Sequence, residues 1–234
     1  MWSRATIAFI MPRFNRNAPG GMVFHVHNRA VGRMRLFTKP ADYVAFEEVI
    51  AETLEKVPMR ICSYCLMSDH WHFVLWPEHD GDLAAFMKRL TVTHVRRWQQ
   101  SKQRVGEGHL YQGRFKSFPV EQSDFFCQIV RFVEQHALRS NLVEHAEDWQ
   151  WSSLWRREKG TAEQRHWLSA WPVARPRGWL KRVNKPLTEE ELEHLRRCVT
   201  RGQPLGSAEW VQSTAEQLGM ESTIRARGRP RKLA

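Results

Sequence analysis

The sequence predicts an α+β protein with a ferredoxin-like split βαβ core, in which an antiparallel four-stranded sheet carries helices on one face, and with a small helical C-terminal subdomain. Segments of β-forming residues and segments of helical periodicity alternate in the order β-α-β-β-α-β-α, which is the order of that core. Beyond Trp155 the pattern changes to a connector rich in Trp and Pro, followed by two short helical segments. These observations separate one main domain from an appendage.

Four segments are expected to form the strands of the sheet. Residues 22–28 and 115–120 hold β-forming side chains, as half-buried strands do. Residues 59–67 and 71–76 are apolar runs separated by a short polar segment that contains Ser68-Asp69, which indicates a β-hairpin.

Three longer segments, residues 39–56, 83–101 and 122–138, have helical periodicity. In the last of them Phe132 and His136 are four residues apart, so they share one face of the helix.

The C-terminal helices are marked by their caps. Thr188 can cap a helix that runs to about Arg201, because Glu191 follows three residues later. Ser207 caps a second helix, which ends near Gly219. We therefore divide the chain into a flexible arm (1–20), a main domain (21–155), a connector (156–186), a helical subdomain (187–220) and a basic tail (221–234).

The charge of the chain points to polyanionic partners. The 234 residues carry a formal net charge of +11 at pH 7, and phosphate contacts are the usual use of such a surface. No apolar run approaches the roughly 20 residues that span a bilayer, and no signal peptide is recognisable. We therefore expect no membrane partner and a cytoplasmic, nucleoid-associated protein. The four cysteines suggest no disulfide framework. Cys62 and Cys65 are expected to face opposite sides of a strand, which argues against a shared zinc ion.

The segment His70-Trp71-His72 is the sharpest chemical feature of the sequence. Alternate residues of a strand face the same side, so both imidazoles point one way and Trp71 points the other way, into the core. Neutral imidazoles ligate Zn, Mn or Ni, but two ligands bind weakly and a third must come from elsewhere. Taken alone, the spacing is better explained by two hydrogen-bonded histidines on a half-buried face. His25 and His27 repeat it and are expected to be structural, with a place near the metal or a DNA groove as the alternative.

The surroundings of this pair resemble the HUH motif of the single-tyrosine, insertion sequence 200-like transposases. Residues 65–76 read Cys-Leu-Met-Ser-Asp-His-Trp-His-Phe-Val-Leu-Trp, a hairpin leading into His-hydrophobe-His and an apolar strand. Four further segments are similar to segments of the family and occur in the same order along the chain, at residues 21–29, 109–117, 131–143 and 149–153. The resemblance covers about residues 18–155, and it is closest to the branch of the REP-associated tyrosine transposases (RAYT).

The resemblance implies cleavage and rejoining of single-stranded DNA in transposition. A helix-borne tyrosine of that family attacks the scissile phosphate and forms a 5′-phosphotyrosine, assisted by a divalent metal. Carried over to this chain, His70, His72 and His136 hold the ion, which would be Mg or Mn, with Zn as a further option. The family tyrosine aligns with Phe132, which has no hydroxyl and is not competent as a nucleophile.

Tyr111 is the residue that we consider as a substitute nucleophile. It lies in a glycine-containing loop near the expected DNA path. Tyr43 and Tyr64 are the only other tyrosines of the chain, and both are expected to be packing residues.

Basic and aromatic residues around the long helix and the loop after it are expected to contact DNA, with charges for phosphates and rings for unpaired bases. They are Arg96, Arg97, Lys102, Arg104, Tyr111, Arg114 and Lys116. A solvated basic face is the alternative. The tail resembles an AT-hook, whose arginines fit a narrow minor groove, and its candidates are Arg227, Arg229 and Arg231.

The sequence therefore favours a transposase-like protein that binds a divalent metal and single-stranded or hairpin, repeat-associated DNA, with a homodimer left open. Two other functions also stay open. One is a non-catalytic, domesticated factor that binds repeat DNA. The other is a metal-dependent nuclease that uses water instead of tyrosine.

Overall fold

The computed structural model describes residues 18–32 and 34–225. Most of the expected arm and the tail residues Arg227, Arg229 and Arg231 lie outside the described residues. Among the helices that are described, none has the length and apolar character needed to cross a bilayer.

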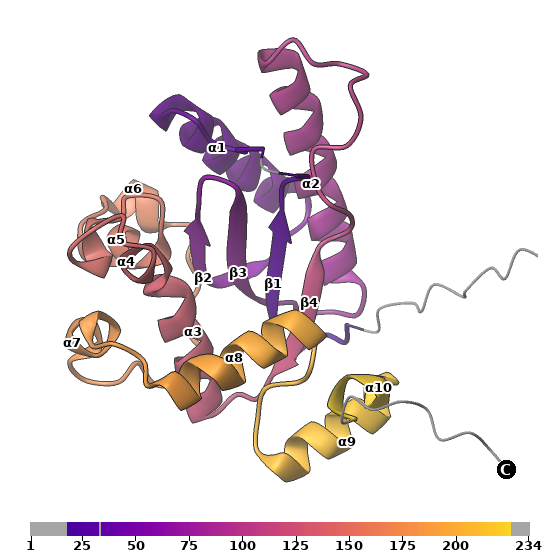
Figure 1. Ribbon diagram of the computed structural model, residues 1–234, viewed down its shortest axis with the longest axis vertical. Coiled ribbons are helices and arrows are strands. Elements are labelled where there is room, and N and C mark those ends of the chain that lie inside the picture. The colour runs from indigo at the N-terminus through magenta and orange to yellow at the C-terminus, as the bar shows by residue number, and fades with distance from the viewer. Residues whose placement is uncertain (1–17, 33, 226–234) are drawn as a thin grey trace, which may run out of the picture.

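The centre of the molecule is the four-stranded sheet that the sequence predicts. Its strands are β1 (Val23–Arg29), β2 (Arg60–Leu66), β3 (His70–Trp76) and β4 (Lys116–Val120). They are arranged in the order β2-β3-β1-β4, and each neighbouring pair is antiparallel (Figure 1). This is the strand order of the split βαβ fold, so the predicted fold class is confirmed.

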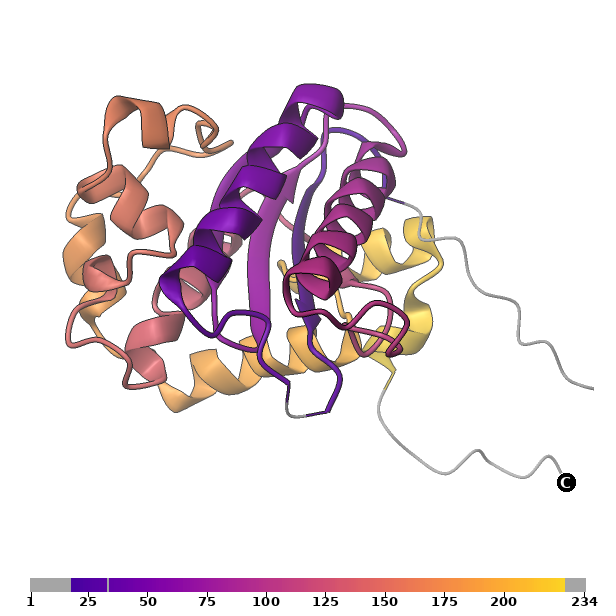
Figure 2. The same cartoon turned by 90° about the horizontal axis from the view of Figure 1, so that it is seen from above.

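Helices α1 (Pro40–Lys56) and α2 (Asp82–Ser101) cover one face of this sheet, lying side by side over it in Figure 2. Large side chains from both helices, such as Phe46 and Leu90, join Trp71 of β3 in one buried core. The predicted spans of both helices agree with the structure to within one residue.

Helix α3 (Asp124–Glu134) packs on the opposite face, a placement that the sequence analysis left undetermined. Its residues Phe126 and Ile129 form a second core with Val74 and Phe118 from the sheet. The expected single helix over 122–138 is interrupted at Gln135, whose side-chain amide donates to two backbone carbonyls of a later segment, 2.6 and 2.7 Å away. The short helix α4 (His136–Arg139) begins directly after this interruption.

One expectation about β2 is wrong. The register of β2 against β3 shifts between Ile61 and Ser63, as at a β-bulge. Because of this irregularity the side chains of Cys62 and Cys65 both enter the core beneath α3, and do not face opposite sides. Both thiols are free and buried.

The rest of the chain forms several short helices and two longer ones, α8 (Glu189–Arg201) and α9 (Ala208–Leu218), and α8 packs on the α3 side of the sheet. The short helices are η1 (Ala146–Asp148), α5 (Ser153–Glu158), α6 (Ala162–Arg165), α7 (Trp179–Asn184) and α10 (Glu221–Ile224). Helices α8 and α9 are capped by Thr188 and Ser207, as predicted. Leu205, between them, exchanges backbone hydrogen bonds with the β4 edge at 2.9 and 3.0 Å. Helix α8 contacts both β4 and α3 and runs beneath the sheet in Figure 2.

A buried carboxylate fastens α3 to the helices that follow it. Glu134 is fully buried, and it accepts hydrogen bonds of 2.8 Å from Ser153 Oγ and from Trp179 Nε1. Burial raises the pKa of Glu134, although these two hydrogen bonds oppose the shift. Because burial penalises the charged form, this carboxyl stabilises the fold more when it is protonated.

We expect Glu134→Gln to remove a pH dependence of stability. The folded-state pKa is raised, so the contribution of the carboxyl is complete below its ordinary pKa of 4.5 and is lost as pH rises through the folded-state pKa. Urea denaturation over a pH series should therefore show wild type losing stability relative to Glu134→Gln as pH rises. The exposed Glu144→Gln serves as the control, and a difference between wild type and Glu134→Gln that does not change with pH would contradict this account.

Candidate metal centre

Three histidines meet between β3 and α4. His70 and His72 project from the same side of β3, while Trp71 between them is buried in the core on the other side. His136 comes from the first turn of α4, and its Nε2 lies 2.9 Å from Nε2 of His70. One ligand atom from each of the three residues lies within 4.8 Å of the others. The structure thus brings together the three residues that the sequence proposes as metal ligands.

Each of these rings has its Nδ1 atom held by a neighbouring side chain. Asp69 Oδ1 lies 2.6 Å from Nδ1 of His70, and Arg139 Nη2 lies 2.9 Å from Nδ1 of His136. Nδ1 of His72 lies 2.9 Å from Nε2 of His25. The Asp69 carboxylate on His70 is an outer partner of the kind that metal-bound histidines characteristically have, because it accepts the ring N–H and fixes ring orientation and tautomer.

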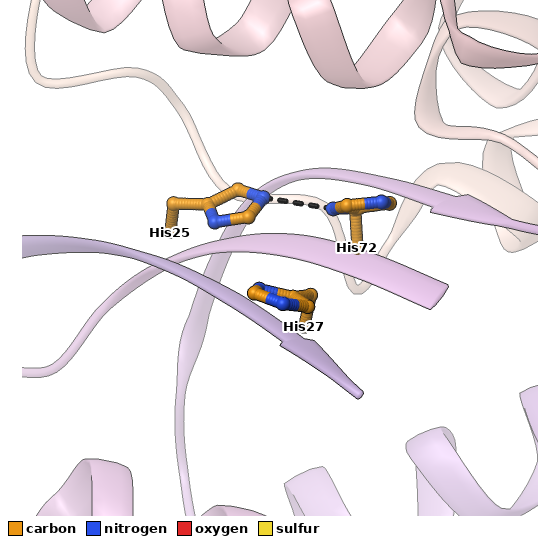
Figure 3. A group of neighbouring side chains, drawn as sticks. All are labelled: His25, His27 and His72. Carbon is orange, nitrogen blue, oxygen red and sulfur yellow. Dashed lines mark hydrogen bonds between the residues drawn. The ribbon is translucent and has the colours of Figure 1, made fainter. Parts of the chain in front are cut away.

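The two histidines of β1 form a second group with His72 (Figure 3). His27 is directly opposite His72 in the β1–β3 register, and His25 lies two residues before it on the same side. Ligand atoms of these three residues also lie within 4.8 Å of one another. His25 is completely buried, and its Nδ1 has no hydrogen-bond partner in the described part of the chain. The structure places His25 and His27 close to His72, and this position fits both a structural role and a place near the proposed metal ligands.

Burial keeps these imidazoles neutral. It is the main cause that lowers the pKa values of His70, His72, His136 and His25, and for all except His70 neighbouring histidines lower them further. Asp69 partly offsets the effect at His70. The neutral form is the one that ligates metal ions, so the centre is electrostatically prepared for a cation.

Phe132 closes one side of the centre. Its ring centroid lies 6.0 Å from that of His72 and 6.1 Å from that of His136, with the ring planes nearly perpendicular. The guanidinium of Arg139 lies 4.1 Å above the Phe132 ring, and its Nη1 donates to the Phe132 carbonyl at 2.8 Å. Phe132 is 4% exposed and also belongs to the core beneath α3.

Tyr111 lies on the other face of the sheet, which counts against its expected role as a substitute nucleophile. Its hydroxyl accepts from Trp71 Nε1 at 3.0 Å and is hydrogen-bonded to His94 Nδ1 at 2.6 Å. Burial raises the pKa of Tyr111 and lowers that of His94 to about 3. Tyr43 and Tyr64 belong to the same α1–α2 core. The sheet therefore separates every tyrosine of the chain from His70, His72 and His136.

A pocket of about 850 Å³ opens over the three histidines. It is bounded by β1, β3, the loop before β4, the α3–α4 junction and helix α8. Its cationic lining residues are Arg29, Arg114, Lys116, Arg139 and Arg196. None of the described residues that line it is acidic. The pocket thus combines a neutral set of nitrogen ligands with a positive rim.

The basic residues predicted from the sequence divide between two surfaces. Arg114 and Lys116 line the pocket, and Lys116 is opposite His27 in the β1–β4 register. The other four, on α2 or just after it, do not line the pocket: Arg96, Arg97, Lys102 and Arg104. Three of these pair with carboxylates, Arg97 with Glu52, Lys102 with Asp42 and Arg104 with Glu107, at 2.8, 3.1 and 2.5 Å.

Residues 20–136 match the sequence model of a family described as "Transposase IS200 like". This match spans half of the chain and runs from the start of β1 to His136. The chain belongs to the IS200-like transposase family. Among curated proteins, no sequence matches it. The solved structure of a REP-associated tyrosine transposase bound to a REP hairpin has a similar fold, with a TM-score of 0.51 and 16% identity over 74% of this chain and 93% of that one.

Three residues of the pocket in this IS200-like family member were missed by sequence reasoning. Arg29 is opposite His70 in the β1–β3 register and pairs with Asp69 at 2.7 Å. Arg139 follows His136 by three residues, a helical spacing that would have brought the two together. Arg196 lies on α8, beyond the residues that match the family, and nothing in the sequence indicates that α8 packs against this site.

We expect Tyr111→Phe to lower stability without altering DNA binding. The change leaves the indole N–H of Trp71 and Nδ1 of His94 unpartnered in the core, which costs roughly 1–3 kcal/mol. Urea denaturation measures the loss, and DNA affinity is then compared at a temperature where the variant is fully folded. Weakened DNA binding with unchanged stability would contradict the placement of Tyr111 described above.

Proposed function

We propose that this member of the IS200-like family binds single-stranded or hairpin, repeat-associated DNA beside a divalent metal, and that it does not cleave DNA through a tyrosine. The observation that carries the proposal is the position of Phe132. It lies beside His72 and His136 at the point where the resemblance to the family places the nucleophile, while all three tyrosines lie on the other face of the sheet.

The residues present fit a divalent metal. Three neutral imidazoles within 4.8 Å of one another form a nitrogen donor set, which suits Zn²⁺ or Mn²⁺. Mg²⁺ prefers oxygen ligands, so we favour Mn²⁺ or Zn²⁺ over Mg²⁺. His70, His72 and His136 would hold the ion, which when bound polarises a phosphate oxygen and offsets its charge.

The positive rim of the pocket supports DNA as the partner. Arg29, Arg114 and Lys116 place cations around the histidines, from β1 and from the segment that leads into β4. A phosphodiester backbone that enters the pocket would meet these cations, and contacts of this kind supply most non-specific affinity for nucleic acid. The similar solved structure is that of a protein bound to a REP hairpin, which supports a hairpin as the ligand of this chain too. The proposal includes nucleoid association and leaves a homodimer open.

Without a tyrosine hydroxyl, the residues of the site bind and orient a phosphodiester but do not attack it. The phenyl ring of Phe132 fills the space beside His72 and His136, and the guanidinium above it carries the positive charge that a phosphate would meet. A direct test can separate binding of the phosphodiester from nucleophilic attack on it.

We expect Phe132→Tyr to confer covalent attachment to DNA. The added hydroxyl would project from a ring that already contacts the histidine group, so a labelled hairpin with Mn²⁺ should give a covalent protein–DNA band in a denaturing gel. Wild type should bind the hairpin and give no such band. Phe132→Tyr combined with His72→Ala is the matched control, and it should lose the band together with the metal.

Two outcomes would contradict the proposal. A covalent band with wild type would show that another residue is the nucleophile. Free cleaved DNA from wild type with Mn²⁺, and no covalent band, would identify the protein as a metal-dependent nuclease that uses water.

We expect Arg114→Ala and Lys116→Ala each to weaken hairpin binding and to flatten its salt dependence. Each lost phosphate contact should reduce the slope of log affinity against log salt by about 0.7 for a single strand. Fluorescence anisotropy over a salt series measures this slope. Arg97→Ala removes the same charge from the α2 surface and should change the slope far less. If Arg97→Ala has the larger effect, DNA binds the α2 surface and not the pocket.

A further inference from the structure

The contact between Arg139 and His136 determines which nitrogen of His136 carries the proton. Nη2 of Arg139 lies 2.9 Å from Nδ1 of His136. A guanidinium is always a donor and never an acceptor, so Nδ1 must accept with its lone pair. The single proton of a neutral His136 ring is therefore on Nε2.

The direction of the next hydrogen bonds follows from this one. Nε2 of His136 lies 2.9 Å from Nε2 of His70, so His136 donates and His70 accepts. The proton of His70 is then on Nδ1, which donates to Asp69 Oδ1 at 2.6 Å. Asp69 in turn accepts from Arg29 at 2.7 Å through its other oxygen. From Arg139 to Arg29 every donor faces an acceptor, and the chain of hydrogen bonds is complete without a metal ion.

Ligation of a metal ion through Nε2 is compatible with the proton position of His70 but not with that of His136. Ligation needs an unprotonated Nε2, and His70 already offers one, because its proton stays on the Nδ1 that Asp69 holds. His136 does not offer one. To ligate through Nε2 its proton must move to Nδ1, and there it would face the N–H of Arg139, which cannot accept it. Two donors cannot share one hydrogen bond, so the contact must break.

We propose that Arg139 controls metal binding at this centre: ligation of an ion by His136 and the Arg139–His136 hydrogen bond exclude each other. Ligation by His136 would free the guanidinium, which would then donate to a DNA phosphate in the pocket. The second part rests on the proposed function, because it names DNA as the ligand. Arg139 is thus a positioning residue for His136 in the metal-free protein and a phosphate contact in the metal-bound one.

The surroundings of Arg139 allow this exchange. Its Nη1 donates to the Phe132 carbonyl, and its guanidinium lies over the Phe132 ring, so these contacts hold the group when Nη2 is released. Arg139 also lines the pocket, together with Arg29, Arg114 and Lys116. Because linkage is reciprocal, metal and phosphate each promote the binding of the other.

The first test measures Zn²⁺ affinity by calorimetry on the full chain. Arg139→Met should raise the affinity roughly tenfold or more, because metal binding no longer breaks a charge-assisted hydrogen bond. Arg196→Met removes a charge from the same pocket without touching a histidine, and it should change the affinity far less. An equal rise in both variants, or none in Arg139→Met, would overturn the proposal. The rise must also disappear when His136→Ala is added, since a rise that persists places the ion elsewhere.

The second test needs no variant and therefore does not depend on how a variant folds. Nitrogen-15 spectra of the histidine rings distinguish the two neutral tautomers. His136 should carry its proton on Nε2 in the metal-free protein and on Nδ1 after Zn²⁺ is added. A proton on Nδ1 in the metal-free protein would refute the proposal.

A third measurement separates this inference from the proposed function. A single-stranded oligonucleotide should raise the Zn²⁺ affinity of wild type more than that of Arg139→Met. If the oligonucleotide has the same effect on both proteins, Arg139 does not take up a phosphate, although the metal centre stands. If neither protein binds Zn²⁺, the metal centre of the proposed function fails and this inference fails with it.

Discussion

The docking of α3 against the sheet face opposite α1 and α2 is the constraint on which the site depends. Alternation along β3 places His70 and His72 on that face and Trp71 on the other. The strand supplies only two imidazoles, and the third reaches them because α3 ends above them and α4 begins with His136. The hydrogen bonds of Glu134 to Ser153 and Trp179 secure this end of α3. A small shift of α3 would thus move His136 away from His70 and His72 while leaving the sheet intact.

The same arrangement explains how a folded protein can bury so many histidines. An unpaired polar group in the interior costs roughly 1–3 kcal/mol, and several protonated rings at this spacing would repel one another. Lowered pKa values remove the charge, and the chain of hydrogen bonds from Arg139 to Arg29 satisfies both nitrogens of His70 and His136. Arg139 and Arg29 are cations at the two ends of this chain, Asp69 is a carboxylate beside Arg29, and only the two imidazoles are neutral. These hydrogen bonds account for both imidazoles, and under the proposed exclusion ligation by His136 would break one of them, the contact with Arg139.

Local pattern predicted the helices and strands, the resemblance to the family proposed the three histidines, and tertiary packing determined what neither could. Strand alternation and helical spacing involve neighbouring residues, so the faces of His72 and Phe132 follow from the sequence. The expectation that Cys62 and Cys65 face opposite sides of β2 is wrong because of the β-bulge near Cys62. One extra residue in a strand changes the face of every side chain before it. Long-range contacts determine which face of the sheet α3 and α8 cover. The sequence does not reveal that the DNA-binding candidates on α2 and those of the pocket lie on different surfaces. The positions of Arg29 and Tyr111 likewise follow only from strand register and packing.

The two faces of the sheet also explain why binding and cleavage can separate in this fold. Phenylalanine and tyrosine differ by one hydroxyl, so a phenylalanine at position 132 preserves the packing of α3 and the contact with Arg139. The histidines, the cationic rim and the pocket do not depend on that hydroxyl for their geometry. Tyr111 cannot replace it, because its own hydroxyl joins Trp71 to His94 in the other core. Under the proposed function, a phenylalanine at this position removes one chemical step and leaves in place the surface proposed to bind a phosphate, so binding can persist without cleavage.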